Sequence, residues 1–113
     1  MSNRVVNNVN AARFRERNKK FALFASGNLV QIDLNLEYST VCKLRPVTKN
    51  DKGKFTYRDR ITFPRSEWLY KWFSNGQIGL FIGRYDGYAV LLIDEGLYAC
   101  PVACIKKVEG NNG

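Results

Sequence analysis

The sequence predicts one small, mostly β domain, a partly open β-barrel with one short helix and a basic N-terminal arm. Its 113 residues are the length of one typical domain. From Val30 onward, apolar and polar residues alternate with a period of two, and turn dipeptides separate short apolar runs. Before Phe21 the chain is polar and basic. We therefore expect residues 1–20 to form a flexible or helical arm, 21–109 the barrel and 110–113 a disordered tail.

The arm carries a strong positive charge. Residues 1–10 are rich in asparagine, and Asn10 is a suitable N-cap for a short helix over residues 11–20. A helix of this length is marginal in water without packing, so we expect it to order when docked on the barrel or on a partner. Against the single acid Glu16, the first twenty residues hold six bases: Arg4, Arg13, Arg15, Arg17, Lys19 and Lys20.

Two strands are predicted next. Apolar and polar residues alternate from Val30 to Glu37, which is the pattern of a strand with one buried face. A second strand follows from Tyr38 to Val47, where Cys42 and Leu44 alternate with basic residues. Residues 49–53 are polar and include a glycine, so they predict a turn.

The third predicted strand runs from residue 54 to Phe63 and ends at Pro64. The side chains expected to be buried are at odd-numbered positions of this strand: Phe55, Tyr57, Ile61 and Phe63. The even-numbered positions include Lys54, Arg58 and Arg60. Because alternate residues of a strand point to opposite faces, these bases predict a basic face on one side of the sheet. Asp59 falls on the apolar parity, which indicates a bulge or a limit to this register.

A short helix is predicted from Glu67 to Phe73, with Ser66 as its N-cap and Gly76 after its end. Its apolar residues lie on one stripe, which favours a core role over a ligand pocket. Together with the later apolar runs, this stripe gives the expected core, namely Trp68, Trp72, Leu80, Ile82, Leu91 and Ile93.

The C-terminal segment begins with an apolar strand, Ile78 to Arg84. Asp86-Gly87 predicts a two-residue hairpin turn, after which Tyr88 to Ile93 returns. A turn over residues 94–96 leads into a strand that Pro101 ends. One helical turn and a last short strand, residues 106–108, complete the expected order.

This order of elements, from Gln77 to Val108, resembles the second half of SH3-like small β-barrels. OB-like barrels give a similar stretch, because the resemblance lies in spacing and turn chemistry. It implies a partly open barrel of about five strands that binds proteins, peptides or nucleic acids. It implies no particular site residue in this chain.

Composition argues against catalysis. The chain has no histidine, which is the commonest general acid–base residue, and no phosphate-binding glycine motif. We expect a non-enzymatic protein without a cofactor. Three cysteines, Cys42, Cys100 and Cys104, fall short of the four ligands of a zinc site and predict free thiols in a reducing cytosol. No apolar run is long enough to span a bilayer, so we expect a soluble, cytoplasmic protein.

Charge provides the functional hypothesis. The net charge is +8, and it is unevenly placed. Residues 1–20 supply 6 − 1 = +5 and residues 48–75 supply 7 − 3 = +4, whereas residues 21–47 balance and residues 76–113 supply 3 − 4 = −1. Positive charge confined to particular segments is typical of a nucleic-acid footprint. Tyr85 and Tyr88 flank the hairpin turn, where exposed rings are available for stacking. The predicted phosphate contacts are Arg13, Arg15, Arg17, Lys19, Lys20, Lys54, Arg58 and Arg60.

Other interpretations of this charge stay open. The arm also suits an acidic protein surface, as in an assembly factor, a virus-encoded modulator of a host machine or a minor structural component. A solubilising tail and a solvated strand face would explain the charge without any ligand. Membrane binding is disfavoured, because residues 11–20 offer only Phe14 as a bulky apolar anchor. The sequence does not distinguish DNA from RNA or indicate an oligomeric state.

Overall fold

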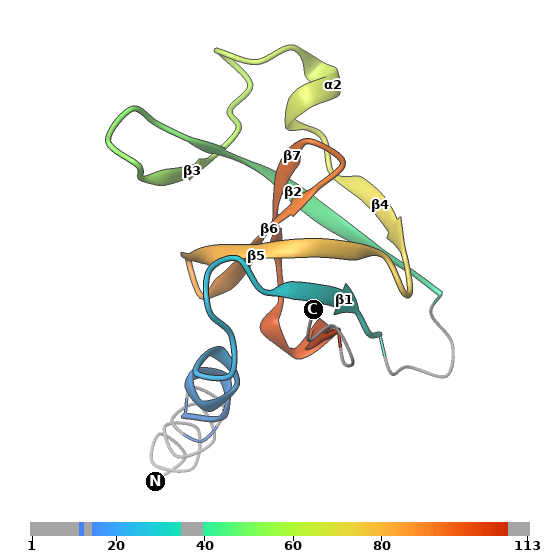
Figure 1. Ribbon diagram of the computed structural model, residues 1–113. Helices are drawn as coiled ribbons and strands as arrows, with labels where there is room; N and C mark the ends of the chain where they lie inside the picture. The colour runs from blue at the N-terminus through green and yellow to red at the C-terminus, as the bar shows by residue number, and fades with distance from the viewer. Residues whose placement is uncertain (1–11, 13–14, 35–39, 109–113) are drawn as a thin grey trace, which may run out of the picture.

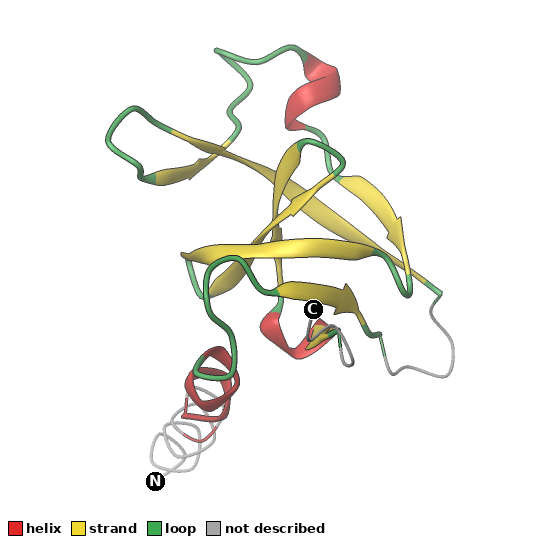
Figure 2. Ribbon diagram, in the orientation of Figure 1, coloured by secondary structure: helices red, strands yellow, loops and turns green. Residues whose placement is uncertain are grey.

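The computed structural model describes residues 12, 15–34 and 40–108 (Figure 1). Eight strands in this part of the chain form one sheet, and every pair of neighbours is antiparallel. The strands are β1 (Leu29–Ile32), β2 (Val41–Lys49), β3 (Phe55–Tyr57), β4 (Lys71–Ser74), β5 (Ile78–Tyr85), β6 (Tyr88–Ile93), β7 (Gly96–Cys100) and β8 (Ile105–Lys107). Two short helices interrupt them, α2 (Arg65–Trp68) and the 3₁₀ turn η1 (Val102–Cys104), as Figure 2 shows.

The sheet is open. Its strand order is β3-β2-β7-β6-β5-β1-β8, with β4 also paired to β2. The two end strands, β3 and β8, do not pair with each other. The mostly β class is therefore confirmed, whereas the predicted barrel is corrected to a sheet that does not close. The long strand β2 pairs with β4 through its first residues, with β7 through its middle residues and with the short β3 through its last residues.

The central strand β6 is buried on both faces. Ala89, Val90 and Leu91 have no exposed surface. Because side chains alternate along a strand, Ala89 and Leu91 enter the larger core and Val90 enters a second core on the other side. This double burial explains why the predicted return strand is a continuous apolar run. The expected burial of Leu91 and Ile93 is confirmed.

Both predicted hairpin turns at the C-terminal end are present. Asp86 and Gly87 have φ of 53° and 78°, and Asp94 and Glu95 have φ of 49° and 70°. Positive φ at both central residues matches the right-handed twist of the flanking strands. The single helical turn after Pro101 is also present as η1.

The predicted helix from Glu67 to Phe73 is wrong. One helical turn, α2, ends at Trp68, and β4 follows. The N-cap of α2 is Pro64, so the predicted cap Ser66 is also wrong and lies inside the helical turn. Trp72 pairs with Lys43 of β2 and is 65% exposed, contrary to its expected burial, while Phe73 turns into the core.

Two further core predictions need adjustment. Trp68 is half-buried rather than enclosed. In β5, the buried residues are Gly79 and Phe81. Leu80 and Ile82 alternate with them, so their side chains point to the other face and stay partly exposed.

The predicted third strand is too long. β3 ends at Tyr57, and the following residues form turns. The carboxylate of Asp59 causes this, because its Oδ1 accepts hydrogen bonds from the backbone N–H of Ile61 at 2.8 Å and of Thr62 at 2.6 Å. Asp59 therefore marks a turn and not a bulge, and Ile61 is 97% exposed.

The chain enters the sheet through a helix that crosses the expected arm boundary. Residues 15–21 are helical, and Phe21 is a member of the larger core. In Figure 1 this helix projects from one end of the sheet. Parts of other predictions lie outside the described residues: 1–11 of the arm, 35–39 of the first two strands, and the tail.

Candidate functional site

Cationic and aromatic side chains meet on the outward face of β2 and β4. On β2, Lys43 and Arg45 are exposed, while Leu44 between them is buried. Lys43 lies directly opposite Trp72 in the strand register. Tyr70 is two residues before Trp72, so the two rings lie on the same side of the chain. We call Lys43, Arg45, Tyr57, Tyr70 and Trp72 the basic aromatic face.

The charges of this face lie over its rings. The Lys43 Nζ is 4.9 Å from the Tyr70 ring centroid and 5.8 Å from that of Trp72. The Arg45 Cζ is 3.8 Å from the Tyr57 ring centroid. These distances are within cation–π range, so the rings hold the cations at the surface without neutralising them. A ligand here would therefore meet positive charge and ring surface together.

Tyr57 connects this face to the β5–β6 hairpin. Its hydroxyl donates a 2.8 Å hydrogen bond to Oδ2 of Asp86, and its ring packs edge-on against Tyr85 with centroids 5.0 Å apart. Burial raises the pKa of the Tyr57 hydroxyl, and the hydrogen bond and charge of Asp86 raise it further, against an opposing effect of Arg45. The hydroxyl therefore stays protonated and keeps one oxygen of the Asp86 carboxylate engaged.

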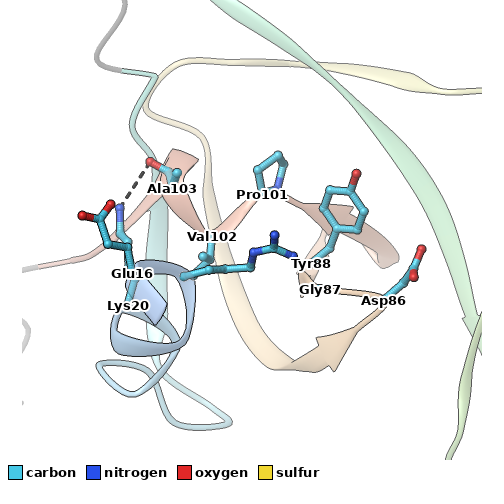
Figure 3. Close-up of a pocket in the computed structure, with 9 residues that line it drawn as sticks. Glu16, Lys20, Asp86, Gly87, Tyr88, Pro101, Val102 and Ala103 are labelled. Atoms are coloured by element: carbon cyan, nitrogen blue, oxygen red, sulfur yellow. Dashed lines mark hydrogen bonds between the residues drawn. The ribbon is translucent and has the colours of Figure 1, made fainter. Parts of the chain in front are cut away.

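Two adjoining cavities lie beside this face. The first, of about 300 Å³, is lined by Lys43, Arg45, Tyr57 and Tyr70 and reaches Tyr88; we call it the aromatic cleft. The second, of about 580 Å³, separates the N-terminal helix from the hairpin and η1; we call it the helix cavity. Figure 3 shows the helix cavity, with side chains of the helix on one side and of the hairpin on the other. The two cavities share three lining residues, Asp86, Tyr88 and Pro101.

The predicted basic residues of the arm lie on the helix beside the second cavity. Arg15, Arg17 and Lys19 are exposed, and Arg17 lies against Gly87 so closely that a side chain there would meet its guanidinium. Lys20 is half-buried, and its Nζ donates a 3.2 Å hydrogen bond to the carbonyl of Ala103. Arg13 lies outside the described residues. The helix thus brings the described arm residues next to the hairpin.

The predicted basic strand face does not form, because β3 ends before Arg58. Lys54 is exposed in the turn that precedes β3. The Arg58 guanidinium forms a 3.4 Å ion pair with Glu67 and lies 5.3 Å from the Phe63 ring centroid. Arg60 lies over the half-buried ring of Trp68, at 5.1 Å. These three bases therefore do not share one strand face.

Sequence reasoning missed Lys43, Arg45, Tyr70 and Trp72 as site residues. The signal for the two bases was present, since they alternate with Cys42 and Leu44 along a predicted strand. The two rings were assigned to a helix whose stripe would face the core. Placing Trp72 on a strand would have put it on the opposite face from Phe73, and so in solvent.

The three cysteines are free thiols, and Cys42 and Cys104 pack against the larger core. Burial raises the pKa of each thiol, and charge interactions among the three raise it further for Cys42 and Cys100. Within the described part of the chain, no cluster of cysteines and carboxylates is arranged to hold a metal ion.

Comparisons with protein-family models, with curated proteins and with solved structures find no match for this chain. None of the helices among the described residues has the length and apolar character needed to cross a membrane. The features of this chain that bear on its function are therefore the basic aromatic face, the two cavities and the charge around them.

Proposed function

We propose that the protein is a non-enzymatic module that binds nucleic acid through its phosphate backbone, with weak sequence preference. The observation that carries this proposal is the pair Lys43 and Arg45, exposed over aromatic rings and bordering the aromatic cleft. Cations in such a groove attract phosphates, and the release of counterions from the nucleic acid drives affinity.

The proposed footprint extends from this face to the N-terminal helix. Arg17 lines the helix cavity, and Arg15 and Lys19 are exposed nearby on the same helix. Lys54 and Arg60 provide exposed charge beyond β3. Arg13 belongs to the proposed set on sequence grounds. Lys20 and Arg58 contribute less in this proposal, because each is already bonded within the protein.

Weak sequence preference follows from the groups that the surface offers. Side chains that read adenine edges by paired hydrogen bonds are Asn and Gln held in fixed positions, and neither is found among the described residues that line the two cavities. Around the two cavities the lining side chains are mainly charged or aromatic, and Asn18 on the nearby helix accepts a hydrogen bond from Arg84. Phosphate contacts position a ligand without selecting its sequence.

Salt dependence tests this proposal. Fluorescence anisotropy with labelled oligonucleotides should give a slope of log affinity against log salt of roughly −3 to −5, for about four to six contacts. Replacing both bases of the face, Lys43→Gln with Arg45→Gln, should flatten the slope by about 1.4 to 1.8, at about 0.7 to 0.9 per contact. The matched control, Lys106→Gln with Lys107→Gln, removes the same charge from β8 and should leave the slope near the wild-type value.

Two results would contradict nucleic-acid binding at this face. One is the absence of binding to any oligonucleotide at low salt. The other is an equal loss of slope in the face variant and the β8 control, which would show only a general effect of net charge.

A docking role on an acidic protein surface is the second candidate. Two aliphatic side chains favour it, since Ile61 is 97% exposed and Leu69 is 39% exposed. Aliphatic groups do not stack on bases, whereas they are common in protein contacts. The resemblance of residues 77–108 to SH3-like barrels implies either kind of partner and does not choose between them.

A further inference from the structure

Three large aromatic rings stay exposed in and beside the aromatic cleft, which Tyr70 and Tyr88 line and which Trp72 adjoins through Lys43. Trp72 is 65% exposed, Tyr70 is 48% exposed and Tyr88 is 39% exposed. Each is a large apolar surface that folding has left in water, although the larger core takes in the neighbouring Phe73. Rings gathered around a cavity, rather than scattered singly, indicate a binding surface.

The chemistry between these rings restricts the ligand. Lys43 reaches both Tyr70 and Trp72, and it lines the cleft together with Tyr88. A ligand that covers the rings must therefore also accept the positive charge that lies over them. Flat bases joined by phosphates meet both conditions, since a base can lie on a ring while its phosphate pairs with the ammonium.

The cleft continues beyond Tyr88. Because Asp86, Tyr88 and Pro101 line both cavities, the path from Tyr70 leads past Tyr88 to the helix cavity and Arg17. Acidic groups border this path at Glu16 and Asp86, and one oxygen of Asp86 is already bonded to Tyr57. Rings followed by cations along one path suit a chain of nucleotides better than a single nucleotide.

We propose that the ligand is single-stranded nucleic acid, whose bases stack on Trp72, Tyr70 and Tyr88 while its phosphates contact Lys43, Arg45 and Arg17. This inference rests on the proposed function and adds the strandedness of the ligand. Bases in a duplex are already stacked on both sides and cannot cover exposed rings without unpairing. Unpaired bases present free ring faces, and stacking on aromatic side chains tolerates any sequence.

Wild-type protein and matched probes test the proposal directly. The probes are an oligothymidylate of about twelve nucleotides, within the site sizes of small single-strand-binding domains, an abasic strand of equal length, the corresponding duplex, and an oligouridylate. All are titrated by anisotropy at one salt concentration. The thymidylate should bind about tenfold or more tighter than the abasic strand and than the duplex, because stacking of even one base is worth about that factor. The uridylate arm tests whether a ribonucleotide strand also binds, since it differs from the thymidylate in the sugar and in the 5-methyl group of the base.

Variants locate the effect on the rings. Tyr70→Ala with Trp72→Ala should remove the preference for thymidylate over the abasic strand, while the salt slope stays the same. Trp72→Phe should retain most of the preference, since a phenyl ring also stacks. The matched control, Ile61→Ala with Leu69→Ala, removes exposed apolar groups that are not aromatic and should bind like wild type.

The possible failures are distinguishable. Equal binding of wild type to thymidylate and abasic strands, or tighter binding to the duplex, would overturn the single-strand inference and leave phosphate binding intact. An aliphatic control that loses as much affinity as the ring variant would also overturn it. Absence of binding to every probe would remove the proposed function itself and favour the protein partner.

Discussion

Trp72 and Phe73 are neighbours in the chain with opposite surroundings. Phe73 is 8% exposed and packs edge-on against Tyr98, with ring centroids 4.8 Å apart. Trp72 faces solvent across from Lys43. A strand turns consecutive side chains to opposite faces, so one residue fixes β4 to the core and the next remains available for a ligand.

The buried thiols provide a prediction at the level of single residues. In the folded protein, burial raises the pKa of Cys100 above its ordinary value of 9.0. The thiol therefore stabilises the fold fully below about pH 9, and this contribution is lost as the pH rises toward the folded-state pKa. Urea unfolding in the presence of a reductant should show constant stability near pH 7–8 and a decline above about pH 9.

Cys100→Ala separates this effect from other alkaline titrations. The variant should be less stable at neutral pH, because it leaves a small gap in the core, yet its stability should decline less steeply above about pH 9. An unchanged alkaline slope in Cys100→Ala would show that the thiol does not contribute and that it is accessible to water.

At the scale of the elements, Gly79 of β5 leaves no room for a side chain against β6. A Cβ at this position would lie 2.9 Å from Cγ1 of Ile93 and 3.0 Å from the carbonyl oxygen of Leu92. Gly79→Ala should therefore destabilise the protein by about 1–3 kcal/mol, the usual cost of overpacking a core, as measured by urea unfolding. The backbone carbonyl cannot move aside without disturbing the sheet.

Gly83→Ala on the same strand is the matched control. Its Cβ would meet only the ring edge of Phe55, at 3.2 Å, and that half-buried side chain can shift. We expect Gly83→Ala to lower the free energy of unfolding less than Gly79→Ala does. If both substitutions lower the free energy of unfolding equally, the effect comes from replacing a glycine in a strand and not from contact with Ile93.

The elements with local turn chemistry were predictable from the sequence. Asp86-Gly87 determines its hairpin because few residue pairs accept positive φ at both positions. Residues 58–74 were not predictable in the same way. A run such as Trp68 to Phe73 fits a helical or a strand period, and the choice depends on pairing with β2, which is remote in sequence.

For the candidate site, sequence charge located the basic segments but not their arrangement. Arg15, Arg17 and Lys19 are exposed on the helix, and their contact with phosphate stays a prediction. The loss of the Lys54–Arg60 face follows from the side-chain turn at Asp59. The basic aromatic face depends on the β2–β4 pairing, and such long-range pairing leaves little trace in local periodicity.

On the scale of the whole molecule, Phe21 and its neighbour Arg84 couple the basic helix to the sheet. Phe21 ends the helix inside the larger core, and the Arg84 guanidinium lies over its ring at 4.3 Å. Arg84 also donates a 2.7 Å hydrogen bond from Nη2 to Oδ1 of Asn18. These contacts position the helix so that Arg17 and Lys20 line the cavity beside the hairpin.

Phe21→Ala tests whether this anchor belongs to the cooperative fold. Removing a buried phenyl ring should cost about 3–5 kcal/mol in urea unfolding, and it should weaken oligonucleotide binding by releasing the helix charges from the cavity. Leu23→Ala is the matched control, because Leu23 is two residues away and 60% exposed, and it should cost less than about 1 kcal/mol. If Phe21→Ala unfolds like the control, the helix is an appendage and the sheet folds without it. If stability falls as expected but affinity does not, the helix charges bind independently of their position beside the hairpin.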